Sequence, residues 1–79
     1  MKHHRLKIEP QYFEDVEAGR KTFEIRREDR GFEIGDTLQL CEFEPMPGLG
    51  YTGREVGRTI TYISYYMQMA GYVVLGMKA

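Results

Sequence analysis

The stretch "GRKTFEIR", from Gly19 to Arg26, joins two kinds of secondary structure in this 79-residue chain. The preceding segment "PQYFEDVEA" (10–18) repeats apolar residues at helical spacing, and Gly19 is suited to the left-handed position that ends a helix. The following segment "TFEIR" (22–26) alternates apolar and polar residues, as a half-buried strand does. We therefore expect a helix over 10–18 and then a strand with Phe23 and Ile25 toward the core.

Alternation continues on both sides of this stretch. We expect four further strands, in "RLKIE" (5–9), "TLQLCEF" (37–43), "REVGRTITYISYYM" (54–67) and "GYVVLGMK" (71–78). The pattern loses its period near Glu42, which favours a bulge there, and Gly57 favours a bend in the long strand. The segments "EDRGFEIGD" (28–36) and "EPMPGLGYTG" (44–53) have the composition of turns and loops.

The element order predicts a mainly β protein with one short helix (α+β). Its length indicates a single domain over 1–79, too small for two packed sheets. Five or six short strands bury their apolar faces best in a small mixed β-barrel, with the helix over one opening. The predicted core consists of Leu6, Ile8, Phe23, Ile25, Leu38, Leu40, Val73 and Leu75.

Composition narrows the classes of function. The net charge is −1, so binding to nucleic acid would depend on a local cationic patch, for which residues 20–30 are the candidate. The single cysteine, Cys41, favours a reducing compartment. The segment "MKHHRLKIEP" lacks the apolar core of a signal peptide, and no apolar run would span a bilayer, so we expect a cytoplasmic domain. No residue pattern indicates a metal or cofactor, since His3 and His4 would point to opposite faces of a strand.

Three charged side chains of the opening stretch are expected to converge. Glu24 and Arg26 stand two positions apart on the predicted strand, so they share a face with Thr22, and Lys21 is long enough to reach the same area. These groups combine cationic donors with a carboxylate acceptor, as a site for a nucleobase and its phosphate requires. The alternative is a surface salt-bridge cluster of little energetic value.

Other residues extend the candidate site. The loop "GYTGR" contributes Tyr51, Thr52 and Arg54, because a mobile ring and guanidinium suit stacking and phosphate contact. Three cations are secondary candidates for ligand contact, each with a purely structural alternative: Lys7, Arg27 and Arg30.

The spacing Gly19-x-Lys21-x-x-Glu24-x-Arg26, between a helix and a strand, resembles the signature of ASCH (activating signal cointegrator homology) domains, which are small PUA-like β-barrels. The segments "REDRGFEIGDTLQL", "YTGR" and "GYVVL" extend this resemblance to a compact bacterial and phage branch of unknown function. It covers nearly the whole chain.

The resemblance implies binding of RNA or of a modified nucleotide in a cleft lined by the signature. Some ASCH domains are amidohydrolases that act on acetylcytidine with the signature Lys, a Thr three residues later and a later Glu. Here Lys21 is retained, but Glu24 stands at the position of the Thr. A binding module is the first hypothesis, a hydrolase with Lys21 and Glu24 the second, and a protein-interaction domain the third.

Overall fold

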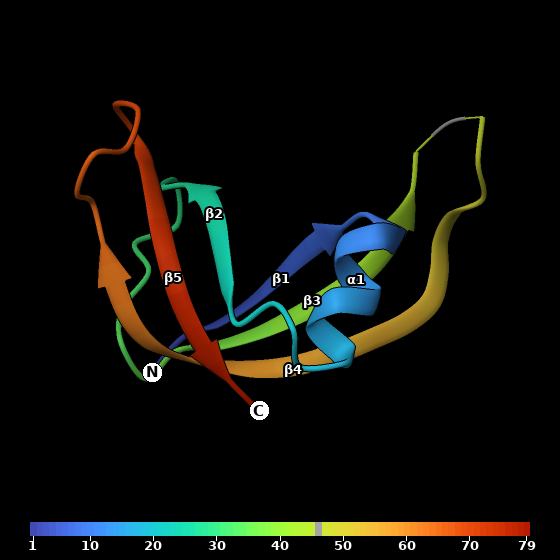
Figure 1. Ribbon diagram of the computed structural model, residues 1–79, viewed down its shortest axis with the longest axis horizontal. Helices are drawn as coiled ribbons and strands as arrows, with labels where there is room; N and C mark the ends of the chain where they lie inside the picture. Colours follow the sequence, from blue (N-terminus) through green and yellow to red (C-terminus); the bar gives the residue numbers. More distant parts are fainter. Residues whose placement is uncertain (46) are drawn as a thin grey trace.

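The computed structural model describes residues 1–45 and 47–79 and is mainly β with one short helix, which confirms the predicted fold class. One five-stranded sheet curls into a half-barrel, and its long strand β4 forms the floor of a trough (Figure 1). The elements in chain order are β1 (His3–Ile8), α1 (Pro10–Glu17), β2 (Phe23–Arg27), β3 (Thr37–Glu44), β4 (Gly50–Ser64) and β5 (Tyr72–Lys78).

The sheet is mixed, with the strand order β1-β3-β4-β5-β2. Strand β1 pairs with β3 in parallel, and the other three pairs are antiparallel. Because β1 and β2 lie at opposite ends of this order, the barrel is open between them. Helix α1 stands on one arm of the trough, while β2 and β5 form the other arm (Figure 1).

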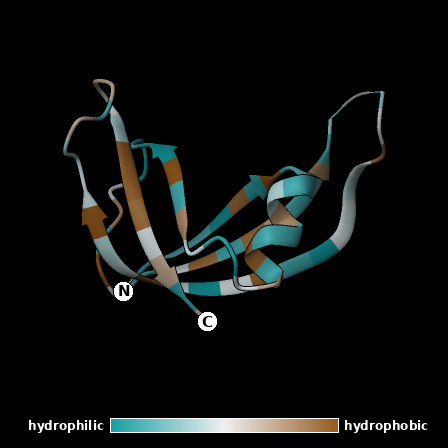
Figure 2. Ribbon diagram, viewed as in Figure 1, coloured by the Kyte–Doolittle hydropathy of each residue, from teal (hydrophilic) through white to brown (hydrophobic). Residues whose placement is uncertain are grey.

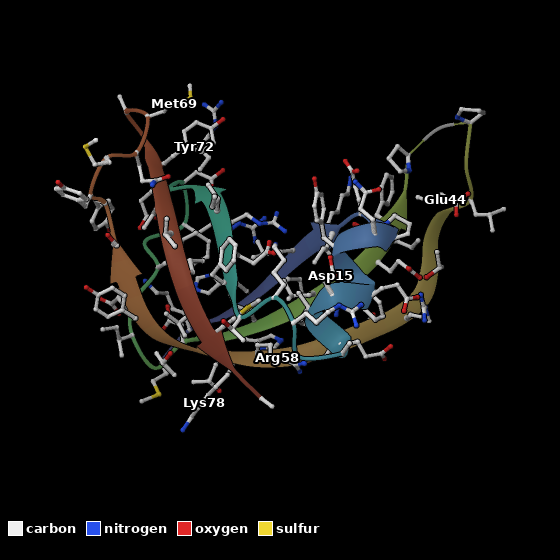
Figure 3. The ribbon with its side chains drawn as sticks, viewed as in Figure 1. Asp15, Glu44, Arg58, Met69, Tyr72 and Lys78 are labelled. Atoms are coloured by element: carbon white, nitrogen blue, oxygen red, sulfur yellow. The ribbon has the colours of Figure 1, made fainter. Side chains whose placement is uncertain are left out.

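Helix α1 buries its inner face and is tied to the sheet near its C-terminal end. Pro10 occupies its first turn, where the missing N–H costs no hydrogen bond. Phe13 and Val16 are completely buried. Arg58 of β4, labelled at the base of the helix in Figure 3, donates from Nη2 to the Val16 carbonyl oxygen at 2.9 Å. This bond satisfies one of the carbonyl groups that the end of a helix leaves unpaired.

Two irregularities bend the sheet. Cys41 pairs with Glu55 and Phe43 pairs with Tyr51, so three residues of β4 face Glu42 alone, and this confirms the irregularity predicted there. The second lies between Ile60 and Tyr62. At Gly57, where the sequence indicated a bend or a bulge, the pairing with β3 is regular, so no bulge occurs there.

The predicted loop 44–53 is shorter in the structure, because β4 already begins at Gly50. Met46, which the prediction included in this loop, lies outside the described residues.

Apolar residues alternate with polar ones along the strands, as the hydropathy colours of Figure 2 show. Six of the eight predicted core residues are buried, and the core cluster consists of Leu6, Ile8, Phe13, Val16, Phe32, Leu38, Leu40, Ile60, Val73, Leu75 and Met77.

The predicted orientation of β2 was wrong by one residue. Phe23 is 43% exposed and Ile25 is 53% exposed, whereas Glu24 is only 3% exposed. Glu24 is paired with Leu75 of β5 and shares its inward face. The alternation of "TFEIR" fits either orientation, and two cations that contact Glu24 offset the cost of burying its charge.

A second buried polar group fastens the loop before β3. The carboxylate of Asp36, 1% exposed, accepts the backbone N–H groups of Lys2 at 2.9 Å and Glu33 at 3.0 Å. Nε2 of His4 lies 2.9 Å from Asp36 Oδ2. These contacts hold the pKa of Asp36 down at about 2, with the His4 hydrogen bond as the largest cause.

Candidate functional site

A cleft opens at the gap between the two edge strands, β1 and β2. It has a volume of about 500 Å³ and is lined by Lys7, Ile8, Glu9, Tyr12, Lys21, Phe23, Glu24, Ile25 and Arg26. The side chains drawn in Figure 3 project into the trough from both arms around it. Four of the predicted site residues, Lys7, Lys21, Glu24 and Arg26, therefore line one cavity.

The turn after α1 sets the position of Lys21. Gly19 adopts a φ of 82°, a left-handed conformation that glycine adopts without strain. The backbone N–H groups of Arg20 and Lys21 then both donate to the Asp15 carbonyl oxygen, at 2.9 and 3.0 Å. One residue later, the Thr22 carbonyl accepts the Met77 N–H at 3.0 Å. Lys21 is thus held between the end of the helix and the start of β2.

Glu24 is the centre of the polar contacts in the cleft. Its Oε1 accepts a hydrogen bond from Lys21 Nζ. Its Oε2 accepts Arg26 Nε at 2.9 Å and lies 2.8 Å from Arg26 Nη2. The Glu24 side chain is 4% exposed, while those of Lys21 and Arg26 are 19% and 24% exposed. The carboxylate therefore lies beneath two cations that face the cleft.

Aromatic rings surround the Lys21 ammonium. Its Nζ lies 5.1 Å from the centroid of Tyr12 and 5.3 Å from that of Phe23, within the range of cation–π attraction. Tyr12 and Phe23 are each more than a third exposed, so part of each ring remains free for a ligand. The sequence interpretation missed both rings as site residues, because helical spacing and strand alternation marked them as core.

Arg26 also connects the two edge strands. Its Nη2 donates to the backbone carbonyl oxygen of Lys7 on β1. A residue of β2 thereby satisfies a carbonyl group that the free edge of β1 leaves exposed. This hydrogen bond joins two residues that line the cleft, and it links the strands at the two ends of the sheet.

The 51–54 segment does not line the cleft. The sequence analysis expected Tyr51, Thr52 and Arg54 to share one site with Lys21, Glu24 and Arg26, and this expectation was wrong. Thr52 Oγ1 donates to Glu42 Oε1 at 2.5 Å. Arg54 donates to Glu42 from Nε at 2.9 Å and from Nη2 at 2.8 Å, and to Glu14 Oε1 at 2.6 Å. Its guanidinium carbon also lies 4.7 Å from the Phe13 ring centroid. Arg54 therefore fastens α1 to the sheet and does not line the cleft.

The charges of this second cluster stabilise each other. The hydrogen bond from Arg54, followed by that from Thr52, lowers the pKa of Glu42 below its usual value. Glu42 and then Glu14 raise the already high pKa of Arg54. Each partner thus favours the charged form of the other.

The remaining candidates lie outside the cleft. Thr22 is exposed and precedes β2. Arg27 is exposed, with its guanidinium 5.6 Å from the Tyr72 ring centroid. Tyr51 and Arg30 line a neighbouring hollow together with Lys7. The structure thus brings Lys21, Glu24 and Arg26 together in the cleft and places the 51–54 segment outside it.

Residues 1–45 and 47–79 contain neither a cluster of metal-binding side chains nor a helix that could span a membrane. These residues contain no group of three or more His, Cys, Asp or Glu side chains that would hold a metal ion. Their one helix is too short and too polar to cross a membrane.

Comparison with known proteins identifies the family of this chain. Residues 3–77 match the family described as "Domain of unknown function (DUF3850)". The chain belongs to the DUF3850 family. A curated protein of Escherichia phage P2, "Uncharacterized 12.9 kDa protein in GpA 3'region", is 41% identical to it over 61 residues. That match includes 77% of this chain and 53% of the phage protein, so the chain spans about half the length of this relative.

Proposed function

We propose that this DUF3850 domain binds single-stranded RNA or a single modified nucleotide, with the base in the cleft between β1 and β2. The observation that carries the proposal is the buried Glu24 carboxylate, which holds Lys21 and Arg26 side by side in a cleft of about 500 Å³. Cavities of roughly 300–1,000 Å³ are typical of small-molecule sites.

The donors of the cleft outnumber its acceptors. An ammonium has three N–H donors and a guanidinium has five. Both Glu24 oxygens already accept hydrogen bonds, and Lys21 and Arg26 have further N–H groups to offer. The ring nitrogens and carbonyl oxygens of a base, or a phosphate, supply the matching acceptors. In this proposal Glu24 positions the two cations and does not read the base itself.

The walls of the cleft suit a planar ligand. Tyr12 and Phe23 present partly exposed rings, and bases stack on such rings with a gain of about 1–3 kcal/mol each. The resemblance of Gly19-x-Lys21-x-x-Glu24-x-Arg26 to the ASCH signature supports the same ligand class and a PUA-like origin of the fold. We place this activity in the cytoplasm, where the buried thiol of Cys41 would stay reduced.

A titration of fluorescent single-stranded RNA pools at 50 and 200 mM salt tests the proposal. If Lys21, Arg26 and one further cation each contact a phosphate, the salt slope is about −2, at roughly 0.7 per phosphate. Arg26→Ala should weaken binding and flatten this slope by about 0.7. Arg27→Ala is the matched control, because Arg27 is an exposed cation of the same strand that does not line the cleft. No binding at 50 mM salt, or equal binding by wild type and Arg26→Ala, would contradict the proposal.

A second candidate is hydrolysis of an acylated nucleobase, favoured by the direct contact of Lys21 Nζ with Glu24. A proton donor and acceptor within hydrogen-bond reach are the minimum for general acid–base catalysis. The test is release of acetate from acetylated cytidine by the purified protein. Turnover that disappears in Lys21→Ala would favour this candidate over simple binding, and binding of the compound without acetate release would exclude it.

A further inference from the structure

A cationic hollow lies beside the cleft. Its volume is about 350 Å³, and its lining consists of Arg5, Leu6, Lys7, Arg30, Cys41 and Tyr51. Lys7 lines both this hollow and the cleft. The two spaces therefore meet at one residue of the edge strand β1.

Lys7 is the uncompensated charge at this junction. Its Nζ lies 4.4 Å from the ring centroid of Phe43 and 5.8 Å from that of Tyr51. Within residues 1–45 and 47–79, Lys7 takes part in none of the ion pairs. Aromatic faces orient the ammonium without neutralising it, so its charge remains available to an anion.

Arg30 is held in place across the gap between the sheet ends. Its Nη1 donates to the Arg5 carbonyl oxygen at 2.9 Å, and the loop that carries it is tied by Glu28 Oε1, which accepts the Gly31 N–H at 2.9 Å. Asp29 lies 3.7 Å from Arg30 Nε. The Arg30 guanidinium is thus held at the hollow, and its other N–H groups can donate to a ligand.

Three carboxylates lie next to residues of the hollow, and each already accepts a hydrogen bond or forms an ion pair: Glu28, Asp29 and Glu55. Glu55 lies 3.1 Å from Arg5 Nη2, and Asp29 pairs with Arg30. Burial raises the pKa of the Cys41 thiol, so it adds no negative charge at neutral pH. The lining of the hollow contains three cations, Arg5, Lys7 and Arg30, and no carboxylate, so it presents a positive charge to a ligand.

We propose that this hollow binds a phosphate group of the ligand whose base occupies the cleft. The inference rests on the proposed function and narrows its ligand to a nucleotide or RNA segment with a phosphate next to the bound base. Lys7 links the two subsites, since its backbone carbonyl accepts a hydrogen bond from Arg26 of the cleft and its Nζ lies 5.8 Å from the ring centroid of Tyr51, which lines the hollow. Lys7 and Arg30 contact the phosphate, and Arg5 supports it electrostatically.

Isothermal titration with the four ribonucleosides and with their 3′- and 5′-monophosphates at 50 mM salt tests this arrangement. Wild-type protein should bind one monophosphate series about tenfold or more tightly than the nucleosides, as expected for charge-assisted hydrogen bonds. Arg30→Gln, at a residue that lines the hollow and not the cleft, should remove most of this ratio and leave nucleoside binding unchanged. Lys7→Gln, at a residue that lines both spaces, should also remove most of the ratio. Arg20→Gln, which removes an exposed charge paired with Asp15 away from both spaces, should change neither.

The outcomes separate this inference from the proposed function. Equal binding of nucleosides and monophosphates, or variants that match Arg20→Gln, would overturn the phosphate subsite and leave the base cleft standing. If neither series binds and the RNA pools also fail to bind at 50 mM salt, the proposed function fails. Inorganic pyrophosphate then tests the hollow by itself. Shifts of the Arg5, Lys7 and Arg30 amide resonances would support an anion site, and their absence would overturn it.

Discussion

The guanidinium of Arg26 joins the two ends of the half-barrel by donating to the backbone carbonyl oxygen of Lys7. The same guanidinium contacts the buried carboxylate of Glu24. One side chain therefore bridges the gap between β2 and β1 and also lines the cleft there. This double role makes the site and the closure of the fold depend on each other.

Arg26→Ala should lower the free energy of unfolding by about 1.5–3 kcal/mol, as expected for the loss of hydrogen bonds to a charged group. The variant also leaves Glu24 buried with Lys21 as its remaining cation. Urea unfolding followed by circular dichroism measures the change. Arg27→Ala, on the exposed face of the same strand, should stay within about 0.5 kcal/mol of wild type. An equal loss in both variants would show that the bridge is not specific.

The sequence predicted most of the fold because most strands bury one face only. Apolar residues at every second position of β1, β3 and β5 match the buried Leu6, Leu38 and Val73. The rule failed at β2, where the charged Glu24 is buried and the apolar Phe23 and Ile25 on the other face are exposed. Burial of Glu24 is decided by partners in space, so the pattern of Phe23 and Ile25 alone pointed to the wrong face.

The candidate site could be predicted as far as it is local in sequence. Lys21, Glu24 and Arg26 lie within six positions, and strand geometry brings them together. Arg54 shows where this reasoning stops, because its contacts with Glu42 and Glu14 depend on the irregularity in β4 and on the docking of α1. Neither feature has a local sequence signal that identifies the partners.

Gly76→Ala should destabilise the protein, because a Cβ at this position would lie 3.0 Å from the Cβ of Tyr62. A Cβ atom moves only with its backbone, so the contact would push β4 and β5 apart. The matched control is Gly57→Ala, also within a strand, where the nearest atom is Gln39 Oε1 at 3.6 Å. Ala has a lower folding entropy cost than Gly by about 0.5–1 kcal/mol, so this control should be neutral or stabilising. Thermal melts of both variants measure the difference.

Two neighbouring helix residues should separate stability from binding. Phe13 is fully buried, and Phe13→Ala should cost about 3–5 kcal/mol of stability. Tyr12 is 45% exposed and lines the cleft, so Tyr12→Ala should cost far less stability but weaken RNA binding by about 1–3 kcal/mol through lost stacking. Unfolding curves and RNA titrations of the Tyr12 variant, set beside wild type, give both numbers. Unchanged RNA affinity of Tyr12→Ala would contradict the stacking role.

The Asp36 carboxylate should make stability depend on acid pH. Its pKa is lowered from the ordinary 3.8 to about 2, so the folded state favours the charged form. This contribution is complete above about pH 4 and is lost as the pH falls through 2. Asp36→Asn should therefore lower the urea midpoint at pH 7, and its difference from wild type should shrink between pH 4 and pH 2. Asp29→Asn, at an exposed carboxylate, should show a small difference at every pH. A gap for Asp36→Asn that stays constant with pH would rule out this linkage.

Glu24→Gln distinguishes a carboxylate that positions two cations from one that reads the base. Both oxygens of Glu24 accept hydrogen bonds from Lys21 and Arg26, so neutralising it should weaken the hold on both. We expect a stability loss of about 1–3 kcal/mol, and RNA binding weakened by a similar factor for all four homopolymers. A carboxylate that accepted base donors would instead change the ranking of the homopolymers. Titrations of each homopolymer, performed at a temperature where variant and wild type are both fully folded, measure the ranking. A changed order at unchanged mean affinity would assign base readout to Glu24 and contradict its role as the residue that positions Lys21 and Arg26.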